Sequence, residues 1–286
     1  MLFLFACDES YDSPKVKLPK GSPRFEPNTY VVAGFFANEK TWRRVERRWK
    51  DANKRYNVPR YHAAHLNAKT WEYEGWTNPQ KIRYSKQMLK ILKDQKKKLH
   101  AISCGLLADE YRKIINEQGR MNFGSPYLVC FKTCVAIIAK EMEEGGFPPE
   151  DQFAVVFDRN DIGTEAVKLF HELKDDPGFK YRSRLAGCIP ADSEEFPILQ
   201  TGDFIAYESF RLLHGRKQGV EQIRTVLKSM FDTNGFSGYY FGRDTLSRIK
   251  EPLESATCRP NGFMVIMPTM RQAVQSGAYV YENPVR

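Results

Sequence analysis

Short, continuously apolar runs alternate with amphipathic stretches along most of the chain. Four of the runs have the length and apolar content of strands buried on both faces of a sheet, at residues 2–7, 30–36, 99–107 and 153–157. A weaker run at 184–189 predicts a fifth strand. Apolar residues spaced three and four apart predict helices over residues 39–58, 79–98, 126–144, 164–173, 196–214 and 218–231.

The order of these elements predicts a fold class. Three strands that follow one another can pair as an antiparallel meander, whereas strands reached through a helix lie parallel to the first by right-handed crossovers. This order, with helices inserted between the second and third strands, is that of the ribonuclease H-like fold. We therefore expect an α/β protein with a mixed sheet flanked by helices. Residues 1–215 would form the ribonuclease H-like domain, and residues 216–286 a helical extension packed on it, with a Gly- and Tyr-rich loop and an apolar run at 263–267.

Positive charge is concentrated in residues 39–98, which we call the basic insertion. The whole chain has a formal net charge of +9, and this segment alone has 18 Lys and Arg against 6 Asp and Glu. Such an excess indicates a surface for a polyanion. All four tryptophans lie here as well. A nucleic-acid backbone is expected to follow these cations while an aromatic ring stacks on a base; the cations are Arg43, Arg44, Arg47, Arg48 and the lysines at 96–98. The alternative is two amphipathic helices with solvated outer faces and Trp42 and Trp49 in the core.

The cysteines and the chain start bear on the compartment. Six cysteines form no CxxC pair and several lie in apolar runs, which indicates free thiols in a reducing setting. The apolar start is too short for a signal peptide, and no stretch approaches the length of a membrane span. We expect a cytoplasmic protein with no membrane partner.

Two carboxylates come directly after buried strands. Asp8 follows the first strand, with Glu9 and Ser10 behind it, and Asp158 follows the fourth. If these two strands are adjacent and parallel, their ends lie side by side at the rim of the sheet. The alternative is ordinary turn chemistry, in which Asp is common after a strand.

Asp203 is the third candidate acid. On its helix, a period of 3.6 residues puts Gly202 and Ala206 on one side and aligns Gln200, Asp203 and Tyr207 on another. The small residues would let this helix lie close to the sheet, so that Asp203 leans over the strand ends. A merely solvated face would carry Lys or Glu beside Asp203, where the sequence has Gln and Tyr.

Acids from three separate elements are what a divalent-ion site with hard oxygen ligands requires. One or two Mg²⁺ or Mn²⁺ ions held by Asp8, Asp158 and Asp203 can bind a scissile phosphate, activate a water and stabilise the leaving oxygen. His62 and His65 are spaced like zinc ligands, but no Cys or third His stands at a recognisable zinc spacing. His62 is expected to carry a proton or contact phosphate, and His65 to be an ordinary histidine.

Several short motifs occur in the order found in one known family. They are Asp8-Glu9-Ser10, His62-Ala63, Asp158-Arg159, Asp192-Ser193, and Leu199-Gln200 followed by Asp203. In this the chain resembles the domain-of-unknown-function 3800 family from about Leu2 to Leu213. Its members are regarded as ribonuclease H-like proteins and metal-dependent nucleases, some linked to defence against mobile elements. The resemblance implies that the family's acidic positions fall on Asp8, Glu9, Asp158 and Asp203 and its histidine on His62, whereas His65 stands where members often have an acid.

The sequence thus favours a divalent-metal-dependent nuclease that hydrolyses phosphodiester bonds of DNA or RNA. Asp8, Asp158 and Asp203 would hold the metal, while Glu9 and His62 assist the chemistry. Substrate contacts are expected from Ser10, Arg43, Arg47, Arg159 and Gln200. Two alternatives remain. One is a non-catalytic nucleic-acid-binding module on the same fold, and the other is a phosphoesterase for small molecules, which would not need the basic insertion.

Overall fold

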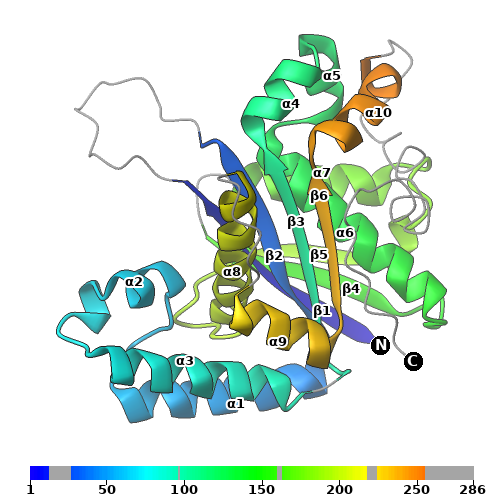
Figure 1. Cartoon of the computed structure of the whole chain (residues 1–286). Coiled ribbons are helices and arrows are strands. Elements are labelled where there is room, and N and C mark those ends of the chain that lie inside the picture. Colours follow the sequence, from blue (N-terminus) through cyan, green and yellow to red (C-terminus); the bar gives the residue numbers. More distant parts are fainter. Residues whose placement is uncertain (13–26, 96, 160–162, 218–223, 255–286) are drawn as a thin grey trace.

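A computed structural model describes residues 1–12, 27–95, 97–159, 163–217 and 224–254. Within these residues one six-stranded mixed sheet runs in the order β5-β4-β1-β2-β3-β6 (Figure 1). The strands are β1 (Leu2–Tyr11), β2 (Thr29–Asn38), β3 (His100–Leu107), β4 (Gln152–Asp158), β5 (Leu185–Ala191) and β6 (Phe236–Phe241). The protein is therefore an α/β protein with a mixed sheet flanked by helices, as the element order predicts.

The pairing of the first five strands is the predicted one. Strands β1, β2 and β3 form an antiparallel meander, β4 lies parallel to β1, and β5 lies parallel to β4. The predicted Gly- and Tyr-rich loop is wrong, because Phe236–Phe241 is β6, which pairs in parallel with β3. The apolar run at 263–267 and much of the loop after β1 lie outside the described residues.

The helices also follow the predicted order. They are α1 (Glu39–Tyr56), α2 (Ala63–Ala68), the short 3-10 helix η1 (Trp71–Tyr73), α3 (Asn78–Lys93), α4 (Ala108–Ile114), α5 (Glu117–Phe123), α6 (Pro126–Glu144), α7 (Gly163–Asp175), the 3-10 helix η2 (Arg182–Arg184), α8 (Leu199–Lys217), α9 (Thr225–Asn234) and α10 (Arg243–Glu254). Local signals set several helix starts: the side chain of Ser125 accepts a hydrogen bond from the Leu128 amide at the start of α6, and Thr77 with Gln80 forms a capping box at the start of α3. Helices α2, α4, α5 and α10 and the two 3-10 helices were not predicted.

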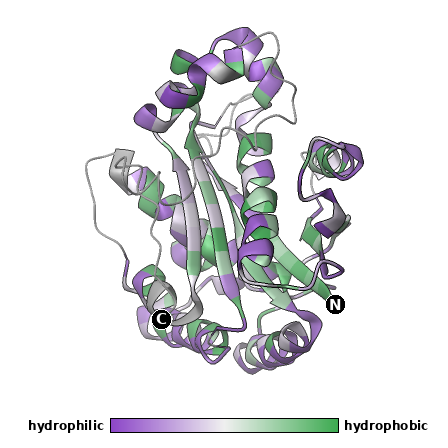
Figure 2. Cartoon of the chain, turned by 90° about the vertical axis from the view of Figure 1, so that its right-hand side faces the viewer, coloured by the Kyte–Doolittle hydropathy of each residue, from purple (hydrophilic) through white to green (hydrophobic). Residues whose placement is uncertain are grey.

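Two cores lie on opposite faces of the sheet. Helix α6 packs on β2 and β3 on one face, and α8 packs on β1 and β2 on the other. The alternation of side chains along β1 follows this division, since Phe5 and Cys7 lie in the core with α6 and Ala6 lies in the core with α8. In Figure 2 the strands are mainly hydrophobic or neutral in colour, and hydrophilic residues gather on the surrounding helices.

The basic insertion contains α1, α2, η1 and α3, and Figure 1 shows α1 and α3 side by side at one end of the molecule. Trp42 and Trp49 are buried there, so the core interpretation holds for both. Helix α3 ends at Lys93, earlier than predicted, and Lys96 lies outside the described residues. Across the described part of the chain no single helix is long and apolar enough to span a membrane, and α5 with α6 meets that test only as a pair bent by 43°.

Candidate active site

The register between β1 and β4 brings Asp8 and Asp158 together. The last β1–β4 pair is Cys7 with Phe157, so Asp8 and Asp158 occupy the next position on two adjacent, parallel strands. This confirms the predicted neighbourhood. The expectation that Asp8 and Glu9 end their strand is wrong, because β1 continues to Tyr11 through its pairing with β2. Asp8 and Glu9 therefore lie on a part of β1 that extends beyond its pairing with β4 and remains paired with β2.

Helix α8 brings the third acid to the same place. Gly202 lies against β1 so closely that an added Cβ would be 2.8 Å from the carbonyl carbon of Cys7 and 2.9 Å from the amide nitrogen of Asp8. Only glycine allows this approach, as the small-residue pattern predicts. The next residue, Asp203, is fixed by the backbone amide of Ala63, which donates to its Oδ2 at 2.6 Å.

The three acids line one cavity of about 250 Å³. Its other lining residues come from the end of the basic insertion and from the approach to α8; they are Arg60, Tyr61, His62, Ser193, Leu199 and Gln200. The Nδ1 atom of His62 lies 3.6 Å from Asp203 Oδ2. Carboxylates from β1, β4 and α8 thus converge on one space that also holds an imidazole and a guanidinium.

The electrostatics of the cavity reflect this crowding. Burial raises the pKa of Asp8 well above its usual range, and the charges of Glu9, Asp203 and Asp158 raise it further. Burial likewise raises the pKa of Glu9 to about 7 and that of Asp203 to about 7, with the Asp158 charge contributing to both. Negative charge is therefore gathered here with little positive charge to compensate it.

Burial and the neighbouring Arg60 act in the opposite direction on the histidine. They lower the pKa of His62 below its usual value, so the ring is neutral at neutral pH. A neutral imidazole can accept a proton or donate one through its second nitrogen. His62 is therefore suited to exchange a proton with a group in the acidic cavity.

The donor set suits a hard cation in chemistry but not in spacing. Carboxylate oxygens are the ligands that Mg²⁺ and Mn²⁺ prefer. In the described part of the chain, however, no group of three or more His, Cys, Asp or Glu side chains is arranged to hold a metal ion, which applies to the zinc alternative as well. Asp203 Oδ2 already accepts from Ala63. The three carboxylates line the cavity without converging on one coordination site, so a bound ion would have to draw them closer together.

Gln200 has a structural place in the site. Its Oε1 accepts hydrogen bonds from Trp49 Nε1 at 2.9 Å, from Asn53 Nδ2 at 3.0 Å and from the Tyr61 amide at 2.8 Å. Its Nε2 donates to the Ser193 carbonyl at 2.6 Å, and the residue is only 1% exposed. The amide group is thus engaged on both sides, and Gln200 joins α8 to the basic insertion rather than offering a free contact for substrate.

The other predicted substrate contacts are dispersed. Ser10 lies further along β1 than the cavity lining, and Arg159 is exposed just after Asp158, whose Oδ1 accepts from its amide. Arg43 is exposed on α1 and pairs with Glu39 at 2.6 Å. Arg47 lines a different cavity. None of these four is among the residues that line the acidic cavity in the described structure.

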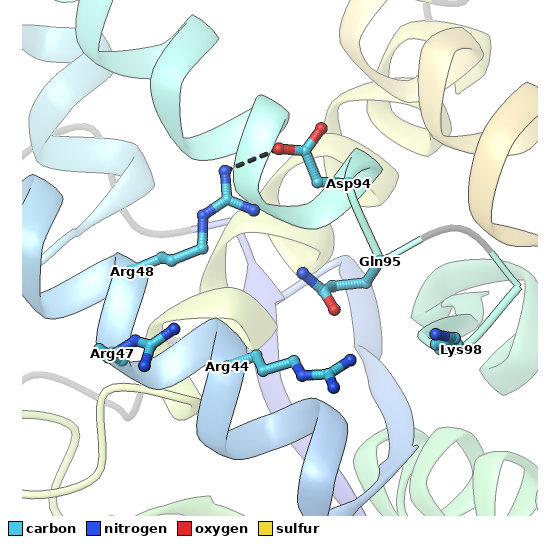
Figure 3. A pocket seen from close by; sticks show the side chains of 6 residues that line it. All are labelled: Arg44, Arg47, Arg48, Asp94, Gln95 and Lys98. Atoms are coloured by element: carbon cyan, nitrogen blue, oxygen red, sulfur yellow. Dashed lines mark hydrogen bonds and ion pairs between the residues drawn. The ribbon is translucent and has the colours of Figure 1, made fainter.

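A second cavity, which we call the cationic cavity, lies between α1 and the end of α3. It has a volume of about 380 Å³ and is lined by Arg44, Arg47, Arg48, Asp94, Gln95 and Lys98. Figure 3 shows the three arginines and Lys98 around this space, with Arg48 held by Asp94 at 2.7 Å. One acid faces four cations, so the cavity suits an anion.

Two residues of the acidic cavity were missed from the sequence. Arg60 lies half-exposed at the rim, 3.9 Å from Glu194, and Tyr61 forms part of the wall. Their position next to His62 was the available signal. What could not be seen is that the basic insertion folds back to build one side of the acidic cavity.

Comparison of the chain with protein-family models, with curated proteins and with solved structures found no match. The resemblance to the domain-of-unknown-function 3800 family therefore stays a prediction based on the motifs quoted above.

Proposed function

We propose that this protein is a divalent-metal-dependent nuclease that hydrolyses phosphodiester bonds of DNA or RNA. The observation that carries the proposal is the convergence of Asp8, Asp158 and Asp203, from β1, β4 and α8, on one cavity beside Arg60 and His62. The raised pKa values of Asp8 and Asp203 support it, because close carboxylates without compensating charge favour a bound cation.

The strand order supports the finer fold assignment that belongs with this function. We propose a ribonuclease H-like fold, in which a three-stranded antiparallel meander is followed by two strands parallel to the first. The order β3-β2-β1-β4-β5 has this form, and β6 is an additional strand beside β3. Asp8 and Asp158 then lie where the parallel pairing of β1 with β4 ends, at the carboxyl end of β4, the usual place for a site in an α/β sheet.

The residues of the cavity have distinct roles in this proposal. Asp8, Asp158 and Asp203 would hold Mg²⁺ or Mn²⁺, which when bound supplies an activated water and neutralises charge on the phosphate. Arg60 offers a guanidinium for a non-bridging phosphate oxygen at the rim. His62, neutral and 3.6 Å from Asp203, can carry a proton between the cavity and solvent. Glu9, with a pKa near 7, is a second proton acceptor close to Asp8.

The test is cleavage of a panel of single- and double-stranded DNA and RNA, with Mg²⁺, with Mn²⁺ and with chelator. Asp158→Asn keeps the oxygen that accepts from the Arg159 amide but removes the charge, and we expect it to lower the cleavage rate roughly 100-fold or more. The matched control is Glu46→Gln on the exposed side of α1, where the acid pairs with Lys50 at 2.7 Å. Equal activity in Asp158→Asn and wild type, or activity that persists in chelator, contradicts the proposal.

A non-catalytic nucleic-acid-binding module is the second candidate. It is favoured by the cationic cavity and by the spacing of the acids, which in the described structure do not close around one ion. The same panel separates the two, because a binding module retains the strands without cutting them. Hydrolysis of free nucleotides alone would instead indicate a phosphoesterase for small molecules.

A further inference from the structure

Three aromatic rings form a stack that begins at the acidic cavity and ends at the surface. The ring centroids of His62 and His65 lie 3.8 Å apart with the planes inclined by 14°. The next pair, His65 and Trp71, has centroids 5.8 Å apart and planes inclined by 21°. His62 lines the acidic cavity, whereas Trp71 is 76% exposed. Its three residues belong to α2, η1 and the residue just before α2, and Figure 1 shows α2 at the left-hand side of the molecule.

Trp71 differs from the other tryptophans in its surroundings. Trp42 and Trp49 are buried, and Trp76 packs among Tyr56, Tyr73 and Tyr84. The side chain of Trp71 is instead 76% exposed, so it stays accessible to a partner from solvent. A flat, exposed ring is the kind of surface on which a nucleobase stacks.

The backbone around Trp71 is held in an uncommon conformation. Its φ angle is +55° and that of Lys69 is +57°, a region that costs a residue other than glycine about 1–3 kcal/mol. The neighbouring Tyr73 is fully buried and fixes the loop, since its hydroxyl donates to the Arg60 carbonyl and accepts from the His62 amide. His65 is held in place by Glu72 at 3.3 Å. The loop is therefore built to hold the ring outward.

Cations lie close to the His62–His65–Trp71 stack. Lys81 Nζ donates to the carbonyl and the side-chain oxygen of Asn67, both at 2.9 Å, which fixes its position next to α2. Burial lowers the pKa of Lys81, and the nearby charges of Arg224, Lys69 and Arg211 lower it further. Elsewhere in this region Glu72 pairs with His65, and Glu208 pairs with Arg224 at 3.0 Å. A phosphate placed here would relieve the crowding of like charge.

We infer that the His62–His65–Trp71 stack is a base-binding platform for single-stranded nucleic acid. A base of the strand stacks on the exposed face of Trp71, its neighbouring phosphates contact Lys69 and Lys81, and the backbone passes His62 into the acidic cavity. A single strand is selected because the bases of a duplex stack on one another and present no free face along its length. This inference rests on the proposed function and names its substrate class.

The cationic cavity is a separate feature in this arrangement. Lys81 lies near the start of α3 and Asp94 just after its end, about 20 Å apart along the axis at 1.5 Å per residue. The two groups of cations therefore flank different ends of the same helix. Binding at the Trp71 platform can be measured while Arg44 and Arg47 stay intact.

The experiment measures binding of fluorescently labelled oligothymidylate to the full-length protein in chelator, so that no cleavage occurs. The variants are Trp71→Ala, Trp71→Phe, and Ile82→Ala as a control at another exposed apolar residue, 51% exposed on α3. The ligands are the single strand, the same strand with abasic sites that keep the phosphates, and a duplex. Quenching of tryptophan emission reports stacking directly.

We expect Trp71→Ala to weaken single-strand binding about 5- to 150-fold and to abolish most of the quenching, since stacking of one base is worth 1–3 kcal/mol. Trp71→Phe should recover most of the affinity, and Ile82→Ala should bind like wild type. If abasic and natural strands bind equally, or Trp71→Ala binds like wild type, the platform is excluded. Because the readout needs no metal, that outcome leaves the nuclease proposal standing, and absent cleavage leaves the platform standing.

Discussion

Replacing Asp203 by Asn should remove part of the loss of stability that this protein undergoes as the pH rises. The pKa of Asp203 is raised to about 7 in the folded protein from a usual value of 3.8. Between these two pH values the folded state keeps the proton and the unfolded state has lost it. Unfolding therefore releases a proton, and the free energy of unfolding falls as the pH rises from about 4 to 7. The asparagine variant lacks this titration but can still accept the hydrogen bond from Ala63.

The magnitude follows from the size of the shift. At 1.36 kcal/mol per pKa unit, a rise from 3.8 to about 7 corresponds to at most about 4 kcal/mol of destabilisation above pH 7. Between pH 5 and pH 7 the advantage of Asp203→Asn over wild type should grow by roughly 2–3 kcal/mol, and above pH 7 it should level off. Glu9 and Asp8 add to the effect, since loss of the Asp203 charge also lowers their raised pKa values.

Urea unfolding in chelator at constant ionic strength, repeated at several pH values between 5 and 8, measures this difference. Glu46→Gln serves as the control, because this acid is partly exposed and paired with Lys50 on the outer side of α1. Added Mn²⁺ should stabilise the wild type at pH 8 more than Asp203→Asn, since it binds the ionised carboxylates. A stability gap that does not change with pH would refute the reasoning about the acidic cavity.

Three further predictions concern the supports of the two cavities. Gly202→Ala should lower the free energy of urea unfolding by about 1–3 kcal/mol, because its Cβ would overlap the β1 backbone; Gly187→Ala, where nothing lies within 4 Å, should show no such loss. Gln200→Ala leaves three buried donors without their acceptor and should cost about 3 kcal/mol in the same measurement, so a loss below about 1 kcal/mol would contradict its structural role. Replacing Arg44 and Arg47 by Gln should lower the slope of log affinity for oligonucleotides against log salt by about one to two, and an unchanged slope excludes the cationic cavity from the binding surface.

The parts of the fold that local sequence determines were predictable. Continuous apolar runs marked β1 and β4, and a predicted helix precedes β4 in the chain. The parallel pairing that places Asp8 beside Asp158 could therefore be expected. The close approach of α8 could be expected from Gly202 as well. In each case the signal lies within a few neighbouring residues, which is why it survives without knowledge of the tertiary structure.

The parts of the fold that depend on contacts between distant segments were not predictable from the sequence. Strand β6 has Gly238 at its centre and Gly235 before it, so its composition resembles a loop and only the edge of β3 makes it a strand. The role of Gln200 depends on donors from α1 and from the stretch before α2, which no spacing in the sequence connects. The exposure of Trp71 likewise follows from the fold around it, because the residue type alone would place a tryptophan in the core.

The hydrogen bonds of Gln200 have a consequence for how the basic insertion can be treated. All three donors to its Oε1 come from residues 39–98, and so does the amide that holds Asp203. Excising this segment, or transplanting it elsewhere, would leave the buried Gln200 amide and the buried Asp203 carboxyl without these hydrogen bonds and would remove one wall of the acidic cavity. A segment that the linear chain presents as an insertion is thus a structural part of the acidic cavity, and truncation experiments on it would test folding before they tested nucleic-acid binding.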